Sequence, residues 1–366
     1  MIGLTHYRTA CTETAELLDD VTFPQKVHWF PESYARAHLG LTYAPHKVAE
    51  KVIDPTLCQT LRDNPAKKTA FILSTGSSNF AGASTQPRQS RLTAHYKILP
   101  LTLTQVWGSR IAQMCGATDH IVTDTSACAS SLKVVMDVQT LINFYGFDRV
   151  CVLGVEDSVN NLSLEFFGES GACLTNKEEV ETGKVPSAFD SKNGGFYVGQ
   201  GAVFAVFEKD PETAHAYLNG AYTAGEPFSN AIGQREDGLG FARAINGAAD
   251  IAGMDADTIR IVKTHGTGTP SNNKAERTAL EGCLKDFIAT SYKPTIGHTM
   301  GASGLLETCL LVDSMKTGIV PAIKNRTEED RIYLSEPAQV QEYATFLSLA
   351  AGMGNVYSAA IFTMGS

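Results

Sequence analysis

The sequence predicts an α/β protein built from two similar halves, and three observations support this. A strand, a helix and a second strand follow one another between residues 120 and 155. The same alternation of apolar strands and longer amphipathic segments returns later in the chain. The chain has 366 residues, of which 43% are hydrophobic, so it can bury a large core. The predicted halves are residues 1–207 and 208–366.

The first half begins with a segment, residues 1–66, in which no clear strand is predicted. The first regular core strand is expected at Thr69–Ser74. Residues 77–89 are rich in Ser, Gly, Gln and Pro, which predicts a loop. A lid, a contact with a partner and disorder all remain open for this loop.

The middle of the first half carries the clearest helix. It begins near Ala129 and ends before Gly146, where a helix stop is expected. Its apolar face holds five side chains: Leu132, Val135, Met136, Val138 and Leu141. The strand Val150–Val155 is apolar almost throughout, as a strand buried on both faces should be. A strand at 199–210 closes this half.

The second half opens with a strand within residues 214–226. A helix at 237–254, a strand at 258–266 and helices at 273–284 and 301–318 follow in order. The last residues, 344–366, predict two strands around a turn that contains glycine.

Charge and cysteine pattern exclude several classes of protein. The formal net charge of −9 argues against nucleic-acid binding. The eight cysteines show neither the spacing of a zinc site nor that of a disulfide framework, so they are expected to be reduced in the cytoplasm. No apolar run approaches the ~20 residues that span a bilayer. The first residues do not form a signal peptide, so no membrane association is expected.

Cys128 is the strongest candidate nucleophile. It lies between a strand ending at Asp124 and a helix beginning near Ala129, so the helix dipole is expected to lower the pKa of its thiol. Small neighbours, from Ser126 to Ser131, leave room for a substrate in a turn like a nucleophile elbow. A small buried packing residue is the alternative interpretation.

Two histidines occupy similar positions in the second half. His265 lies in KTHGTGTP, at the end of an apolar strand, and His298 lies in KPTIGHTMGASG, before a glycine-rich helix start. Chemistry tends to collect at such strand ends. Either histidine alone is more often structural, but two in glycine-flanked loops together with Cys128 indicate a catalytic site.

Three segments, TDTSACASSL, THGTGTP and KPTIGHTMGASGLLE, resemble the active-site blocks of the β-ketoacyl synthases in order and spacing. The similarity extends from about residue 68 to the C-terminus. It implies the thiolase fold, with two similar halves in a five-layered αβαβα arrangement. It also implies a homodimer or a ketosynthase-like heterodimer.

Residue by residue, the resemblance implies that Cys128 is the nucleophile and that His265 and His298 form the histidine pair of the elongating type. Lys293 and Glu307 match the supporting lysine and glutamate, which are expected to fix the state of His298 by charge and hydrogen bonding. The activity implied is a decarboxylative Claisen condensation between an acyl chain on Cys128 and malonyl-acyl carrier protein. No cofactor or metal is expected.

The sequence departs from the family at several positions. In the turn Gly352-Met353-Gly354, Met353 replaces an aromatic gate residue, although its amide is still expected to share an oxyanion site with that of Cys128. Tyr357 replaces an asparagine, Asn273 an aspartate and Gln200 a glutamate. The glycine-rich opening strand of the family is missing. These changes favour a specialised acyl substrate, such as a polyene chain.

Two other functions stay open at this point. The altered final turn is compatible with an acyltransferase or a malonyl decarboxylase. The chain is also compatible with a non-catalytic, chain-length-setting subunit of a heterodimer, although Cys128 and both histidines weigh against that. Four basic residues are candidates for a surface that binds the acidic carrier protein, with a solvated loop as the alternative: Arg88, Arg91, Lys97 and Arg110.

Overall fold

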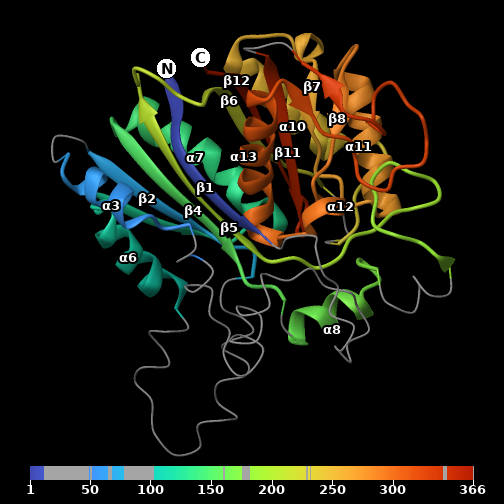
Figure 1. Cartoon of the computed structure of the whole chain (residues 1–366), viewed down its shortest axis with the longest axis horizontal. Helices are drawn as coiled ribbons and strands as arrows, with labels where there is room; N and C mark the ends of the chain where they lie inside the picture. The colour runs from blue at the N-terminus through green and yellow to red at the C-terminus, as the bar shows by residue number, and fades with distance from the viewer. Residues whose placement is uncertain are drawn as a thin grey trace, which may run out of the picture.

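A computed structural model describes residues 1–11, 49, 52–64, 68–77, 103–159, 161–174, 182–227, 230, 232–340 and 344–365. A ten-stranded mixed sheet runs through this part of the chain, in the order β3-β2-β4-β5-β1-β6-β12-β11-β7-β8. Helices pack on its faces (Figure 1). Among the described residues, none of the helices combines the length and the apolar character that crossing a membrane requires.

The two halves of the sheet repeat one topology. In the first half the strands are β1 (Ile2–Cys11), β2 (Thr69–Ser74), β3 (His120–Asp124), β4 (Arg149–Glu156) and β5 (Gly201–Lys209). Their counterparts are β6 (Ala216–Gly225), β7 (Ile261–Lys263), β8 (Ile288–Thr290), β11 (Thr345–Gly352) and β12 (Val356–Met364). Each half has its second strand parallel to its third and fourth strands. The two orders are mirror images that meet at the β1–β6 pair.

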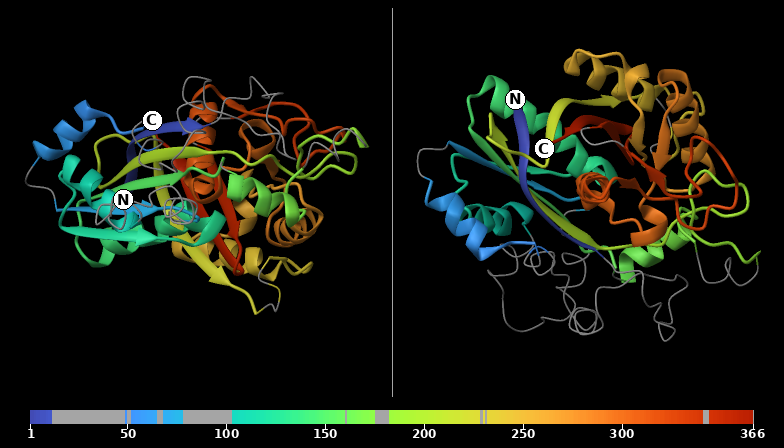
Figure 2. Two further views of the ribbon diagram at one scale, coloured as in Figure 1. Left: turned by 90° about the horizontal axis from the view of Figure 1, so that it is seen from below. Right: turned by 45° about the horizontal axis from the view of Figure 1, so that its top comes forward.

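Helices divide the molecule into five layers. Outside the first half lie α3 (Pro55–Arg62) and α6 (Thr104–Met114), and outside the second lie α10 (Leu239–Ala252) and α11 (Pro270–Cys283). Between the halves lie α7 (Ser130–Phe144) and α13 (Ser303–Lys316), which contact strands of both halves and each other (Figure 2). Apart from three short 3₁₀ turns, the remaining described elements are α8 (Asn161–Glu169), α12 (Lys293–Ile296) and a small sheet of β9 (Ile319–Val320) and β10 (Ala338–Gln339).

The alternating direction of side chains along each strand explains the layers. On β2, Ala70 and Ile72 join the core around α7 and α13, while Phe71 and Leu73 join the core under α3 and α6. Successive side chains of a strand point to opposite faces, so an apolar strand serves two cores. The predicted αβαβα arrangement of two similar halves is confirmed.

Most predicted elements are found, several with shifted ends. Strand Thr69–Ser74 agrees with β2 at both ends, and the predicted helix face packs on the central core. The expectation that the chain has no strand before Thr69 was wrong, because β1 pairs with β5 along most of its length. The strand predicted at 258–266 shortens to Ile261–Lys263. The loop at 77–89 falls almost wholly outside the described residues, and the division after residue 207 stays a prediction.

The carboxyl ends of the parallel strands lie on one side of the molecule, and the loops that follow them carry the candidate residues. Cys128 follows β3 in a short 3₁₀ turn, Ala127–Ala129. His265 follows β7, and Met353 follows β11. Carboxyl ends of parallel strands commonly hold functional residues, because loops from several strands meet there.

Candidate active site

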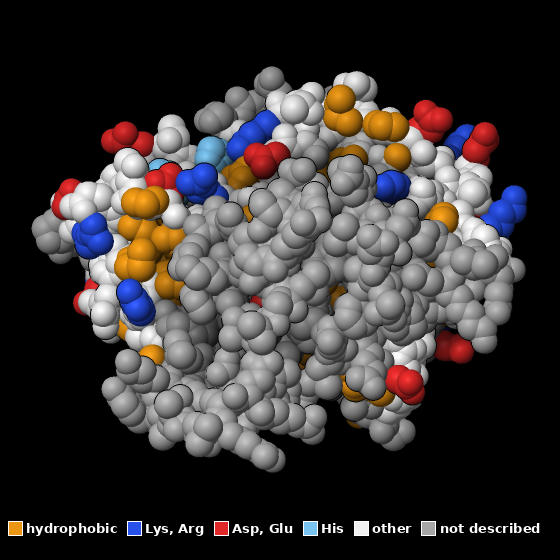
Figure 3. Space-filling view, turned by 60° about the horizontal axis from the view of Figure 1, so that its bottom comes forward, with side chains coloured by type: hydrophobic (Ala, Val, Ile, Leu, Met, Phe, Trp, Pro, Cys, Tyr) orange, Lys and Arg blue, Asp and Glu red, His pale blue; other side chains and the backbone are white. Residues whose placement is uncertain are grey.

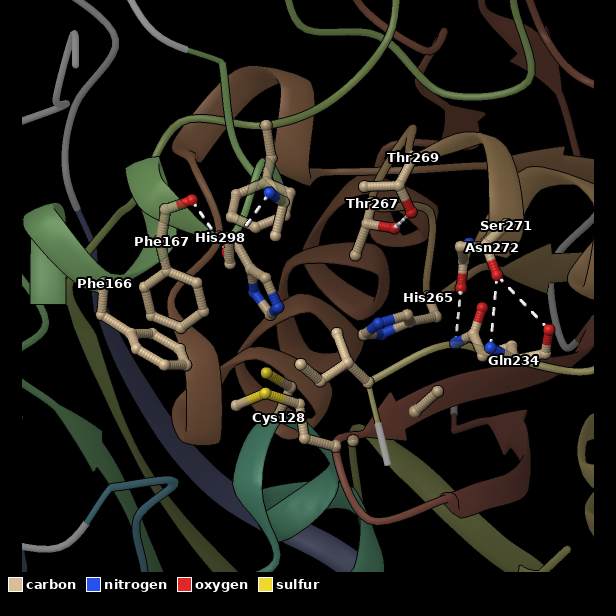
Figure 4. A pocket seen from close by; sticks show the side chains of 17 residues that line it. Cys128, Phe166, Phe167, Gln234, His265, Thr267, Thr269, Ser271, Asn272 and His298 are labelled. Atoms are coloured by element: carbon tan, nitrogen blue, oxygen red, sulfur yellow. Dashed lines mark hydrogen bonds between the residues drawn. The ribbon is translucent and has the colours of Figure 1, made fainter. Parts of the chain in front are cut away.

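Cys128, His265 and His298 line one pocket (Figure 4). Gly352 and Met353 line it too, so the predicted final turn also reaches the site. Further lining comes from aromatic and polar side chains: Phe166, Phe167, Phe196, Thr267, Thr269 and Gln234. Sequence reasoning did not identify these six.

The turn that carries Cys128 is sharply bent. Ala127 has a φ of 49°, in the left-handed region that L-residues rarely adopt. The Ser130 hydroxyl donates to the Ala127 carbonyl and accepts from the Ser126 N–H, which holds the bend. The turn therefore presents the Cys128 thiol at the pocket, as predicted from its small neighbours.

His265 is held through its backbone. Its N–H and that of Gly266 donate to the two carboxylate oxygens of Glu276, at 2.5 and 2.9 Å. Asn272 also donates to Glu276, at 2.8 Å. Glu276 is fully buried on α11, and it fixes the loop after β7 while the imidazole stays directed at the pocket.

His298 is held through backbone and ring. Its N–H donates to the Tyr197 carbonyl at 2.7 Å, and its carbonyl accepts from Gly199 at 2.9 Å. The Met300 N–H donates to Nδ1 of the ring at 3.2 Å. In a neutral ring, an Nδ1 that accepts leaves the proton on Nε2. His298 therefore offers an Nε2–H donor.

Both imidazoles are neutral. Burial lowers the pKa of His265 and of His298 well below the usual value, and the positive charge of Lys293 lowers each further. Their ring centroids lie 5.7 Å apart at 80° to each other. The pair can therefore offer neutral hydrogen-bonding groups to one small oxygen-bearing group.

Behind the histidines lies a buried group of three charges. Lys293 Nζ is 2.8 Å from a Glu307 oxygen, and Lys263 Nζ is 3.3 Å from the other. All three side chains are at most 1% exposed. Lys263 was not predicted, although a lysine two residues before His265 in an apolar strand is a visible signal. Burial lowers the pKa of Lys263 to about 8.

The expected link from Lys293 to His298 is only partly correct. Lys293 donates to the His265 backbone carbonyl, and within the described residues the ring of His298 receives its hydrogen bond from Met300 instead. Lys293 therefore acts on His298 through its positive charge, which lowers the pKa of that histidine.

The thiol itself differs from expectation. Burial raises the pKa of Cys128 to about 12, and the charge of Lys293 only partly opposes this. The helix dipole was expected to lower this pKa, whereas the loss of hydration of a buried thiolate acts in the opposite direction. The resting nucleophile is a neutral thiol.

The final turn packs directly on the nucleophile. A Cβ at Gly352 would lie 2.7 Å from the Ser126 oxygen and 3.1 Å from the Ala129 nitrogen, so only glycine fits. Gly354 has a φ of 84° and open space around it. The side chain of Met353 is 37% exposed at the pocket. This turn stands beside the Cys128 backbone, where the oxyanion site was expected.

Tyr357 does not damage this region, although it departs from the family. It is 1% exposed, and its hydroxyl donates to Glu226. The same carboxylate accepts from the N–H groups of Arg235 and Gly240 at 3.3 and 3.1 Å. Tyr357 thus anchors the loop that carries Gln234 to the pocket.

The other departures have structural partners or packing. Asn273 accepts a hydrogen bond from the Phe189 N–H at 3.2 Å. Gln200 is buried. Of the basic candidates, Arg110 is exposed on α6, and Arg88, Arg91 and Lys97 lie outside the described residues.

Family models match most of the chain. The model described as "Beta-ketoacyl synthase, N-terminal domain" matches residues 39–213, and the one described as "Beta-ketoacyl synthase, C-terminal domain" matches residues 215–327. The two matched segments contain Cys128, His265 and His298.

Curated relatives agree. The "Putative polyketide beta-ketoacyl synthase 1" of Streptomyces halstedii is 30% identical over 293 residues, which cover 75% of this chain and 67% of the relative. The "3-oxoacyl-[acyl-carrier-protein] synthase 2" of Vibrio cholerae is 27% identical over 240 residues, covering 62% and 57%. The matches thus span about two thirds or less of these relatives.

Solved structures share the fold. A type II polyketide ketosynthase complex with its acyl-carrier protein has a TM-score of 0.78 at 16% identity, covering 99% of this chain and 98% of the other. A β-ketoacyl synthase from Burkholderia phymatum has a TM-score of 0.78 at 18% identity, covering 99% of both chains. Since both identities are low, these likenesses bear on the fold alone.

Proposed function

Because the chain belongs to the β-ketoacyl synthase family, we propose that it is an acyltransferase that condenses a Cys128-bound acyl chain with malonyl-acyl carrier protein. The observation that carries the proposal is the convergence of Cys128, His265 and His298 on one pocket. Residues from both halves of the chain meet there, at the ends of parallel strands.

The first step is acyl transfer to Cys128. Its sulfur attacks the carbonyl carbon of an acyl thioester, the carrier's C–S bond breaks, and the thiol proton leaves on the carrier thiol. The positive charge of Lys293 favours negative charge on Cys128. Backbone N–H groups of Cys128 and Met353 stabilise the tetrahedral oxyanion.

The second step forms the carbon–carbon bond. The malonyl group loses carbon dioxide, and the electron pair of the broken bond gives an enolate. Neutral imidazoles suit this oxygen, because the Nε2–H of His298 donates to it without an added proton. The enolate carbon attacks the acyl carbonyl, the Cys128 C–S bond breaks, and the thiolate takes a proton from solvent.

A partner subunit has a surface available on the first half. Within the described residues, strand β3 ends the sheet, and next to it α6 exposes Leu103, Val106 and Met114 at its start and along its length. Figure 3 shows apolar side chains gathered on the flank where Figure 1 places α6. Open sheet edges favour pairing with another chain. We propose a homodimer or a heterodimer through this edge, which light scattering of the purified protein tests.

We propose a cytoplasmic location, and the state of the cysteines supports it. All eight lie in the described part of the chain, and none forms a disulfide. Reduced buried thiols are typical of a cytoplasmic enzyme, and we place the protein there. Fractionation of the source cells tests this.

The experiment for the activity adds malonyl-carrier protein to acyl-carrier protein and the purified protein, and follows carbon dioxide and product. The proposal expects a β-ketoacyl product from the native protein and none from Cys128→Ala. Carbon dioxide without condensed product would identify a decarboxylase. Complete inactivity, restored only by a second subunit whose own cysteine is required, would identify the scaffold role.

A further inference from the structure

Two cysteines that the proposed mechanism does not use meet in the outer layer of the first half. Cys58 lies on α3, and Cys115 is the residue that follows α6. These two helices lie beside each other (Figure 1). The two sulfur atoms are 2.8 Å apart, although 57 residues separate them in the chain. A disulfide bond is ~2.05 Å long, so the sulfurs need to approach by less than about 1 Å to form one.

The backbone beside the two cysteines is already held together. The Arg62 guanidinium, at the end of α3, donates to the Met114 carbonyl at 2.7 Å. Gly116 has a φ of 67°, and a Cβ there would lie 2.9 Å from Cγ and 3.2 Å from Cα of Arg62. The residues on both sides of Cys115 therefore contact α3, and a bond between the sulfurs needs no large backbone movement.

The two thiols differ in acidity. The hydrogen bond from Cys115 lowers the pKa of Cys58, and the positive charge of Arg62 lowers it further. The same hydrogen bond raises the pKa of Cys115, and burial raises it as well. The thiolate is the reactive form of cysteine. Cys58 is therefore the sulfur that attacks an oxidant, and Cys115 is the thiol that completes the bond.

Only a thin layer of the protein covers this pair. Of the eight residues of α3, only Cys58 and Leu61 are buried, so one short helix separates the sulfurs from solvent. A helix of this length gains little stability from its own hydrogen bonds, and such elements open locally at low cost. A small oxidant can therefore reach Cys58 without unfolding of the sheet.

We propose that Cys58 and Cys115 are a modification site, at which hydrogen peroxide converts the two thiols into a reversible disulfide bond. The Cys58 thiolate attacks one oxygen, the O–O bond breaks, and the other oxygen leaves as water after taking up a proton. The Cys115 sulfur then attacks the sulfenic acid on Cys58, and its S–O bond breaks to release a second water. Two thiols are oxidised by two electrons, and one peroxide is reduced to two waters. Cytoplasmic disulfides of this kind are usually transient.

The test maps disulfide bonds after oxidation. The purified, reduced protein is treated with hydrogen peroxide, whose concentration is raised until the partly exposed Cys283 reacts. Free thiols are then blocked with N-ethylmaleimide in denaturant, and the peptides are analysed without reduction. We expect a linked pair of peptides that contains Cys58 and Cys115, and dithiothreitol should release it. Cys58→Ser should yield no linked pair and should leave Cys115 open to the blocking reagent.

Cys151→Ala is the matched control, because Cys151 on β4 is a third cysteine buried in the same core. It should keep the link between Cys58 and Cys115. A link from Cys115 to Cys151, or a native protein whose Cys58 and Cys115 are both blocked after Cys283 has reacted, would overturn the inference. Mapping of the native protein decides this alone if a variant does not fold. No acyl donor is present, so the outcome is independent of the proposed function.

Discussion

The neutrality of His298 sets a pH dependence of stability. Its pKa is lowered well below the ordinary value in the folded chain, whereas an unfolded histidine has a pKa of about 6.5. Below that pH the unfolded chain binds a proton that the folded chain does not, so folded stability is lost as pH falls.

His298→Asn removes this proton. We expect the native protein to lose about 1 kcal/mol of unfolding free energy relative to this variant between pH 7 and pH 5.5. Urea unfolding at both pH values measures the change. His265→Asn should behave alike, since burial and Lys293 also lower the pKa of His265. A gap that does not vary with pH would show that folding does not lower the pKa of these histidines.

Replacing two buried tyrosines by phenylalanine is expected to change the free energy of unfolding in different ways. Tyr357 donates its hydroxyl to Glu226, whereas the hydroxyl of Tyr333 has no hydrogen-bond partner among the described residues. Tyr357→Phe should lower the free energy of unfolding by about 2 kcal/mol, because a hydrogen bond to a carboxylate is lost. Tyr333→Phe should be neutral or stabilising. Denaturant midpoints of the two variants decide, and an equal loss in both would contradict the assignment.

At this scale the sequence predicts residues whose neighbours are diagnostic. Cys128, His265 and His298 stand in glycine- or alanine-rich blocks, and the structure places all three in one pocket. It does not predict partners far away in the chain. Tyr357 was seen only as a departure from the family, because its acceptor Glu226 lies 131 residues earlier in the chain.

At the scale of elements, the contact between the β11–β12 turn and the Cys128 turn leaves no room for a larger side chain. Gly352→Ala would press a Cβ onto the Ser126 oxygen, whereas Gly354→Ala meets only the cost of its positive φ, about 1 kcal/mol. We expect Gly352→Ala to slow acylation of Cys128 at least tenfold more than Gly354→Ala does. Single-turnover acylation rates measure this, and equal rates would mean that the turn yields without moving the nucleophile.

Elements were predictable where their own pattern was strong. Strand β4 is apolar almost throughout from Val150 to Val155, and α7 shows an apolar face. Strand β1 escaped prediction because half of its side chains are only partly buried and its pairing with β5 joins residues about 200 apart. Helix α6 escaped because it exposes apolar residues, which blurs its periodicity.

Across the whole molecule, the duplication explains why the site lies where it does. In each half the carboxyl ends of the parallel strands lie on the same side of the molecule. The central helices α7 and α13 contact strands of both halves and join them. One half supplies the nucleophile, and the other supplies the histidines and the buried lysines. The echo between the halves was visible in the sequence, whereas the pairing of β1 with β6 that joins them was not.

The central claim is that Cys128 carries the acyl chain, and intact mass after incubation with acyl-carrier thioesters tests it most directly. We predict one acyl adduct on the native protein, none on Cys128→Ala, and an unchanged adduct on Cys283→Ala, whose cysteine is partly exposed on α11. An adduct that persists in Cys128→Ala, or that disappears in Cys283→Ala, would contradict the account.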